Sequence, residues 1–197
     1  MTTFLYRTFV PGCIIVLWLA ACAPQMAAGP KAVNPELSRT WSDRSTTFMA
    51  AGSPGEGLEA ANLAIRYDAG NITAWENKTL SLVELEQWDE ALQAADQTLA
   101  LKPNNAAAST SKAIALTNLS RCSEALQALD RALKVRPEGA VLWFDQARCR
   151  AKQGERERAL KSLAKAIALD PKLKSAAVAE ADLESLRNDP DFLNLVK

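Results

Sequence analysis

Small and apolar side chains recur along the chain with the spacing of an amphipathic helix. In three segments, 91–101, 125–135 and 159–169, they stand at the first, second, fifth, eighth, ninth and eleventh residues, which places them on one face of a helix. Two residues after these segments stand Pro103, Pro137 and Pro171. Because proline cannot donate the backbone hydrogen bond that continues a helix, it marks the helix end. The pattern therefore predicts three similar helices, each closed by a proline.

The three prolines lie 34 residues apart, and this period divides the chain into repeats. The repeats span 38–71, 72–105, 106–139 and 140–173, with the proline at repeat position 32. A constant period of this length is typical of a solenoid, in which each repeat is a pair of helices that stacks on the next pair. Small residues at positions 8, 20 and 27 let the two helices approach closely. They are Ser45, Thr79, Ala113 and Ala147 at position 8, Gly57, Ala91, Ala125 and Ala159 at position 20, and Ala64, Thr98, Ala132 and Ala166 at position 27.

These positions resemble the tetratricopeptide repeat (TPR), whose pattern has Trp, Gly or Ala, Ala, an aromatic residue or Leu, Ala and Pro at positions 4, 8, 20, 24, 27 and 32. Position 4 holds Trp41, Trp75, Ser109 and Trp143. The resemblance covers 38–173 and implies an all-α, right-handed solenoid of four antiparallel helix pairs. One departure is position 7, usually Leu in the family, which holds Arg44, Lys78, Lys112 and Gln146. These polar residues predict looser packing of the first helices.

The two ends of the solenoid differ from its middle. The first repeat has Ala69 in place of the proline, as an atypical capping repeat would. Residues 174–197 are predicted to form a C-terminal capping helix and tail, because the last helix pair would otherwise leave an apolar side in water. Glu180, Asp182 and Glu184 are expected on the solvent face of that helix. A turn is expected inside the first and fourth repeats at Gly52 and Gly154, since glycine tolerates a left-handed backbone.

The N-terminus reads as an export signal. The apolar stretch from Thr8 to Ala21 is too short to span a bilayer comfortably, so 1–21 is predicted to be a signal peptide. The sequence Leu-Ala-Ala that ends it, followed by Cys22, resembles the bacterial lipoprotein box. The resemblance implies cleavage before Cys22 and attachment of acyl chains such as palmitate to it. Residues 22–37, rich in Ala, Pro and Gly, are predicted to be a flexible tether.

Lipidation at Cys22 implies a membrane anchor in the bacterial cell envelope. Several acyl chains hold a protein stably, because each buried methylene contributes roughly 0.8 kcal/mol. The next residue is Ala23, whereas Asp there would be the usual signal for retention in the inner membrane. The expected location is therefore the periplasmic face of the outer membrane. The alternative is an ordinary secreted protein whose signal ends beside a cysteine.

The composition argues against most enzymatic functions and against nucleic-acid binding. The chain has 23 basic and 23 acidic residues and no histidine. Without histidine there is no Ser-His or Cys-His arrangement and no histidine metal site, and no phosphate-binding glycine motif occurs, so we predict neither an enzyme nor a cofactor or metal. Basic residues are interspersed with acidic ones rather than gathered beside aromatic residues, so nucleic acid is not an expected partner.

Two cysteines, Cys122 and Cys149, remain after Cys13 is lost with the signal and Cys22 is lipidated. In an exported, oxidising compartment a pair of thiols tends to form a disulfide where geometry permits. The TPR arrangement places the two residues in adjacent repeats, so a bridge is one prediction. The alternative is that each packs in the core as a small hydrophobic residue.

A concave groove lined by the first helices is the binding surface that the TPR resemblance implies. Its predicted partner-binding residues are Glu76, Leu80, Val83, Glu84, Ile114, Asn118, Phe144, Arg148 and Lys152. This groove is apolar in its middle, acidic towards the second repeat and basic towards the fourth, and suits a peptide. The family's Lys and Asn clamp for a chaperone C-terminus is not repeated here.

These features predict a membrane-anchored scaffold or adaptor that binds a peptide or another envelope protein. Two alternatives stay open. One is a pilotin-like or secretion-assembly lipoprotein, which also combines a lipoprotein box with TPRs. The other is a noncatalytic regulator of a cell-wall enzyme. The sequence leaves the identity of the partner and the oligomeric state open.

Overall fold

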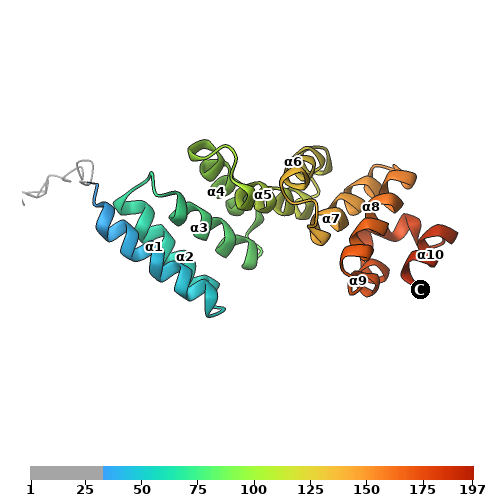
Figure 1. Cartoon of the computed structure of the whole chain (residues 1–197), viewed down its shortest axis with the longest axis horizontal. Helices are drawn as coiled ribbons and strands as arrows, with labels where there is room; N and C mark the ends of the chain where they lie inside the picture. Colours follow the sequence, from blue (N-terminus) through green and yellow to red (C-terminus); the bar gives the residue numbers. More distant parts are fainter. Residues whose placement is uncertain (1–32) are drawn as a thin grey trace, which may run out of the picture. The chain divides into compact units, whose positions relative to one another are not determined.

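A computed structural model describes residues 33–197 of the chain. The described part is helical throughout, without a strand (Figure 1). The helices are α1 (Pro35–Ala50), α2 (Pro54–Tyr67), α3 (Ile72–Glu84), α4 (Trp88–Leu101), α5 (Ala106–Asn118), α6 (Cys122–Val135), α7 (Ala140–Lys152), α8 (Arg156–Leu169), α9 (Leu173–Ala179), the 3-10 helix η1 (Ala181–Leu186) and α10 (Pro190–Val196).

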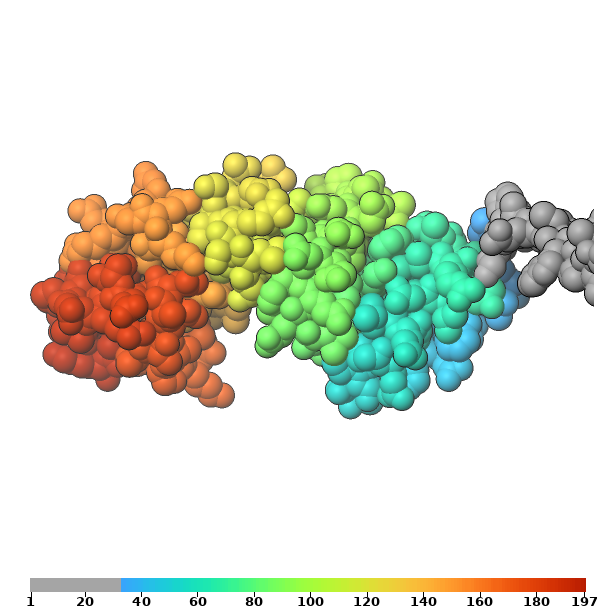
Figure 2. Space-filling model, turned by 180° about the vertical axis from the view of Figure 1, so that it is seen from behind, coloured from blue at the N-terminus to red at the C-terminus, as the bar shows by residue number. Residues whose placement is uncertain are grey.

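Helices α1 to α8 form four antiparallel pairs that stack in chain order, and this confirms the predicted fold class. Each pair consists of a first helix and a second helix joined by a tight turn. Both the ribbon and the space-filling view show the pairs following one another from blue to orange (Figure 2). The first helices α1, α3, α5 and α7 contact one another along the stack, so one surface of the solenoid is built from them.

Asparagine side chains fix where the first helices of the first three pairs start. The side-chain oxygens of Asn34, Asn71 and Asn105 accept hydrogen bonds from backbone N–H groups three residues later, at 3.0 Å each. Such caps satisfy N–H groups that have no partner inside the helix. Because Asn34 caps α1, that helix begins at Pro35 rather than at Ser38. The last residues of the predicted tether, 35–37, are therefore helical.

The turn inside every helix pair uses one left-handed residue at repeat position 15. Gly52 and Gly154 have φ of +74° and +75°, as predicted from the sequence. The equivalent residues Glu86 and Ser120 have φ of +56° and +57°. A side chain makes this backbone conformation unfavourable, so the second and third repeats carry strain that glycine relieves in the other two.

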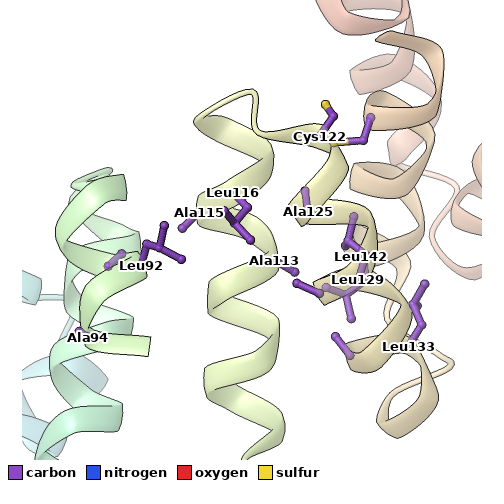
Figure 3. Packing of buried hydrophobic residues seen from close by; sticks show 14 of the residues in the cluster. Leu92, Ala94, Ala113, Ala115, Leu116, Cys122, Ala125, Leu129, Leu133 and Leu142 are labelled. Atoms are coloured by element: carbon purple, nitrogen blue, oxygen red, sulfur yellow. The ribbon is translucent and has the colours of Figure 1, made fainter. Parts of the chain in front are cut away.

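Small residues at the predicted positions form the contact between paired helices. Ala113 on α5 and Ala125 on α6 are fully buried, together with Leu129. Figure 3 shows these side chains where α5 faces α6, with Leu142 of the next helix pair beside them. Interiors of this kind are close-packed, so even one added methyl group would disturb the packing of the two helices. The alanines therefore set the distance between the two helices.

Two of the polar residues at position 7 link neighbouring repeats. The ammonium of Lys112 on α5 binds the carboxylate of Asp96 on α4. One repeat later, the amide of Gln146 donates to Asp130 Oδ1 at 2.8 Å, and its oxygen accepts from the Ser162 hydroxyl at 2.8 Å. Two of the four side chains that replace the family's Leu, Lys112 and Gln146, thus contact the preceding helix pair.

The C-terminal segment forms three short helices, whereas a single capping helix followed by a tail was predicted. Glu180 has extended backbone (φ −70°, ψ 120°), which ends α9 and begins η1. Leu183, Leu186 and Phe192 are buried against α7 and α8. The tail thereby covers the apolar side of the last helix pair. The physical reason for the break is that Glu180 and Asp182 bind α7 instead of facing water.

Candidate partner-binding groove

Helices α3, α5 and α7 carry the nine predicted groove residues. On α3, Leu80 is an exposed leucine, with 44% of its surface accessible. Val83 beside it is half-buried and Glu84 is exposed. An exposed leucine next to a half-buried valine is an apolar patch that water covers poorly, so this part of the surface can accept an apolar side chain.

The next first helix, α5, continues this apolar strip. Ile114 is half-buried, and Asn118 is exposed with its amide donating to the Ile114 carbonyl at 3.0 Å. Glu76 on α3 already has a partner within the chain, because its carboxylate accepts a hydrogen bond from the Asn105 side chain at the start of α5. The open part of the predicted groove is therefore the strip of Leu80, Val83, Glu84, Ile114 and Asn118, which we call the α3–α5 strip.

The α7 end of the groove is covered by the chain itself, which differs from the open groove expected from the sequence. Phe144 is only 7% exposed and packs with Ala177, Leu183 and Phe192 of the C-terminal segment. Phe144 is therefore part of the core formed with the tail. A direct contact between Phe144 and a partner would require the tail to move.

Arg148 sits at the centre of a cluster of ion pairs. Its guanidinium lies 3.1 Å from Asp145, 3.2 Å from Glu180 and 3.0 Å from Asp182. The Arg148 side chain is 15% exposed. Burial by itself lowers the pKa of Arg148, but attraction by the carboxylates of Asp145, Glu180 and Asp182 outweighs it and raises the pKa. The cluster fixes η1 on α7.

Asp145 is the most buried carboxylate of this cluster. Burial raises the pKa of Asp145 to about 6, while the Arg148 guanidinium pulls the pKa in the opposite direction. Glu180 and Asp182 add to the upward shift by repulsion. One carboxylate oxygen of Asp145 is buried and accepts no hydrogen bond from any group of residues 33–197. The ionised carboxylate of Asp145 is thus poorly solvated, and the charge of Arg148 only partly offsets the cost of burying it.

Lys152 is the most exposed of the three predicted residues on α7. Its ammonium lies 3.0 Å from Asp182 and donates to the Ser120 hydroxyl at 2.9 Å. The hydrogen bond to Asp182 raises the pKa of Lys152. Lys152 and Arg148 therefore hold the same carboxylate of η1. Asp145, Glu180 and Asp182 were not predicted as site residues, although Asp182 follows Arg148 by one repeat length, 34 residues.

The two remaining cysteines are free thiols in the part of the chain that the structure describes. Cys122 at the start of α6 and Cys149 on α7 are both buried. The Cys149 thiol lies 3.9 Å from the Thr117 hydroxyl. Burial raises the pKa of Cys149, and the neighbouring Cys122 raises it further. The predicted disulfide remains a prediction.

The predicted lipidation site, Cys22, and the signal peptide lie outside the described residues. None of the helices within residues 33–197 is both long enough and apolar enough to cross a membrane.

Comparison with known sequences identifies the repeats. A model of the tetratricopeptide repeat family matches residues 77–121 and 110–174. These matches span the second, third and fourth helix pairs. No curated protein matches this sequence.

Solved structures share the same architecture. MamA 41-end from Desulfovibrio magneticus RS-1 is 20% identical, with a TM-score of 0.69 over 83% of this chain and 91% of that one. The MamA RS-1 ArsTM double mutant is 20% identical, with a TM-score of 0.69 over 84% of this chain and 94% of that one. YrrB, described as a TPR protein with an unusual peptide-binding site, is 20% identical, with a TM-score of 0.66 over 82% and 84% of the two chains. At these identities the likeness shows the fold alone.

Proposed function

Because this chain carries tetratricopeptide repeats, we propose that it is a noncatalytic scaffold or adaptor that binds another protein of the bacterial envelope. The observation that supports this most directly is the α3–α5 strip. Leu80 is exposed at its centre, with Val83 and Ile114 half-buried beside it and Glu84 and Asn118 at its polar edge. Apolar anchors inside a polar rim are the usual composition of a protein-binding surface.

The ligand we propose for the strip is a peptide segment with an apolar anchor. The strip runs across two adjacent first helices, so a segment lying over it would contact both. The peptide-binding site named for YrrB, a protein of the same fold, agrees with a ligand of this kind. The α7 end contributes only if the C-terminal segment is displaced from Phe144, Arg148 and Lys152.

The proposal includes a lipid anchor at Cys22 and a place on the periplasmic face of the outer membrane. Its support is the lipoprotein-box sequence that ends at Cys22 and the Ala23 that follows. The expected effect of Cys22→Ser is release of the protein from the membrane fraction into the soluble envelope fraction. A Cys22→Ser protein that stays with the membranes would contradict the anchor. The pilotin-like role and the regulation of a cell-wall enzyme remain narrower forms of this proposal, with no specific contact favouring either.

Site-specific cross-linking tests the binding surface. A photoreactive residue in place of Asn118 is expected to form one discrete cross-linked product in intact cells. Leu80→Asp should abolish that product, because a carboxylate cannot be desolvated against an apolar anchor. The matched control is Val135→Asp, since Val135 is also exposed but lies at the end of α6. Equal products from the two variants would refute the α3–α5 strip as the binding surface.

A further inference from the structure

Three of the four repeats place a tryptophan at repeat position 4, and two of these indoles make the same hydrogen bond. The Trp75 indole N–H donates to the Ala69 carbonyl at 2.9 Å. The Trp143 indole N–H donates to the Pro137 carbonyl at 2.8 Å. In both cases the acceptor lies six residues before the tryptophan, in the loop that enters the first helix. The position is thus a repeated indole site.

Cations accompany these indoles. The Arg44 guanidinium lies 4.6 Å from the centre of the Trp41 ring, and the Lys78 ammonium lies 5.3 Å from that of Trp75. Both cations follow their tryptophan by three residues, which puts them one turn away on the same face of the helix. The attraction between a cation and the face of an indole adds to the stability of each site.

The third repeat has Ser109 in place of the tryptophan, and a cavity of about 400 Å³ opens there. Its lining includes Leu99, Pro103, Ser109, Lys112, Leu116 and Arg131. A similar hollow one repeat earlier is lined by Trp75 but not by Ile65 and Ala69, the residues equivalent to Leu99 and Pro103. In the second repeat, where the Trp75 indole donates to the Ala69 carbonyl, the indole stands in the lining in place of these two positions. The Ser109 cavity therefore reaches the two positions that the second repeat closes with its indole.

The polar partners of an indole are also in place at Ser109. The Pro103 carbonyl lies six residues earlier, and no N–H or O–H group of residues 33–197 donates to it. The Ser109 hydroxyl cannot replace the indole N–H, because it donates to the Asn105 carbonyl of its own helix at 2.8 Å. Lys112 follows Ser109 by three residues, as Lys78 follows Trp75. The lining of the cavity thus combines apolar side chains, an acceptor and a cation that pairs with Asp96.

We infer that the Ser109 cavity binds the tryptophan side chain of a partner polypeptide. A polypeptide is the proposed source because the cavity adjoins the Trp75-lined hollow one repeat earlier, which has a volume of about 620 Å³ and also lies against α4. Asp96 lines that second hollow and pairs with Lys112, which lines the first, so the two are neighbours across one ion pair. The polar side chains along both hollows can bind the backbone on either side of an inserted tryptophan.

This site is separate from the α3–α5 strip. Ser109, Lys112 and Leu116 are spaced i, i+3 and i+7, which places them on one face of α5. Ile114 and Asn118 of the strip stand on the opposite face by the same helical geometry. The two surfaces can therefore be tested independently, and failure of one leaves the other intact.

Nuclear magnetic resonance titration of the mature full-length protein tests the inference. The probe is the capped pentapeptide Gly-Ala-Trp-Ala-Gly, with the matched Phe peptide and free tryptophan as the other arms. The Trp peptide is expected to shift the amide signals of Ser109, Leu116 and Ala128 and to saturate. The Phe peptide should bind roughly fivefold more weakly, because it cannot donate to the Pro103 carbonyl.

Blocking variants complete the test. Ser109→Trp should abolish the binding of the peptide and raise the melting temperature, because the new indole fills the cavity. Ser175→Trp, the same change on the exposed face of α9, is the control and should bind as the wild type does. If Ser109→Trp does not fold, Ser109→Leu serves as the blocking variant. Equal binding of the Trp and Phe peptides, tighter binding of free tryptophan than of the peptide, or binding unchanged by the blocking variant would each overturn the inference.

Discussion

The guanidinium of Arg148 binds the carboxylate of Asp182 at 3.0 Å, and the two residues are separated by one repeat length, 34 positions. The pair joins the fourth first helix, α7, to the segment that follows the last repeat. Because both side chains are mostly buried, removing the charge of one leaves the other poorly compensated. The C-terminal segment is thus held by charge as well as by its buried leucines.

Asp182→Asn is expected to lower the free energy of unfolding by about 2 kcal/mol, since Arg148 and Lys152 both lose a charged partner. Hydrogen exchange should accelerate in residues 180–187 before it does so in α3 or α5. Urea denaturation and exchange followed by mass spectrometry measure the two effects. Glu184→Gln, which neutralises an exposed carboxylate of η1, should change neither. Equal effects of the two variants would show that the ion pairs do not hold the segment.

Stability is expected to depend on pH through Asp145. Burial raises the pKa of this group from 3.8 to about 6, so the folded protein binds a proton more tightly than the unfolded chain does. Folding then takes up a proton between about pH 4 and pH 6, and the stability contributed by Asp145 falls as pH rises through this window. The expected loss is about 3 kcal/mol.

Urea denaturation at several pH values, on the wild type and on Asp145→Asn, measures this effect. The variant cannot titrate at this position, so the difference in stability between the two proteins should change across the window and stay constant above it. Asp43→Asn, on the exposed side of α1, is the control. A constant difference between wild type and Asp145→Asn from pH 4 to pH 7 would contradict the raised pKa.

Glu86→Gly should stabilise the protein by about 0.5 to 1 kcal/mol. Glu86 has a left-handed backbone at the turn of the second repeat, where Gly52 and Gly154 stand in the first and fourth. Glycine removes the steric penalty, and this gain exceeds its greater loss of entropy on folding. Gly154→Ala should have the opposite sign, since φ is +75° there. Chemical denaturation of both variants measures whether the free energy of unfolding rises in Glu86→Gly and falls in Gly154→Ala. A destabilised Glu86→Gly protein would contradict the argument.

Cys122 and Cys149 are expected to be joined when the protein folds in an oxidising compartment. Cys122 stands at the start of α6 and Cys149 on α7, so a bridge would join two helices that already pack together. The raised pKa of Cys149 makes its thiolate scarce in the folded state, so oxidation after folding should be slow. Mass spectrometry of exported, unreduced protein should show the loss of two hydrogens.

The bridge is expected to stabilise the protein by about 2 to 4 kcal/mol relative to its reduced form. The reduced protein should resist alkylation at both cysteines until it is unfolded, because both thiols are buried. Cys122→Ser provides the matched control, with one thiol that cannot pair. Alkylation of both cysteines when the exported wild-type protein is denatured without a reductant would refute the disulfide.

The 34-residue period predicted the helix pairs, since each position had to satisfy the same packing four times. It did not predict that Glu86 and Ser120 would adopt the backbone of glycine. That conformation is imposed by the geometry of the turn, which repeats whether or not the residue is well suited to it. Helix positions were therefore readable from the pattern, whereas local strain was not.

The groove was only partly predictable, because its α7 end depends on contacts between distant residues. Glu180 and Asp182 look like solvent-facing acids when only their own helix is considered. In the structure both carboxylates form ion pairs with Arg148, and the predicted capping helix is interrupted at Glu180. In the same way, Ser109 was visible as an exception at position 4, but the cavity beside it depends on Leu99 and Pro103 of the preceding repeat.

The covering of α7 by η1 also determines where a further repeat could be added to the stack. A further 34-residue unit added after Leu173 would separate Asp182 from Arg148 and remove the ion pair that holds the C-terminal segment on α7. A unit inserted before Ala140 would leave that ion pair intact and lengthen only the part of the stack that precedes the last helix pair. The solenoid is therefore expected to accept an inserted unit before α7 and to lose its covered end when a unit is added after α8.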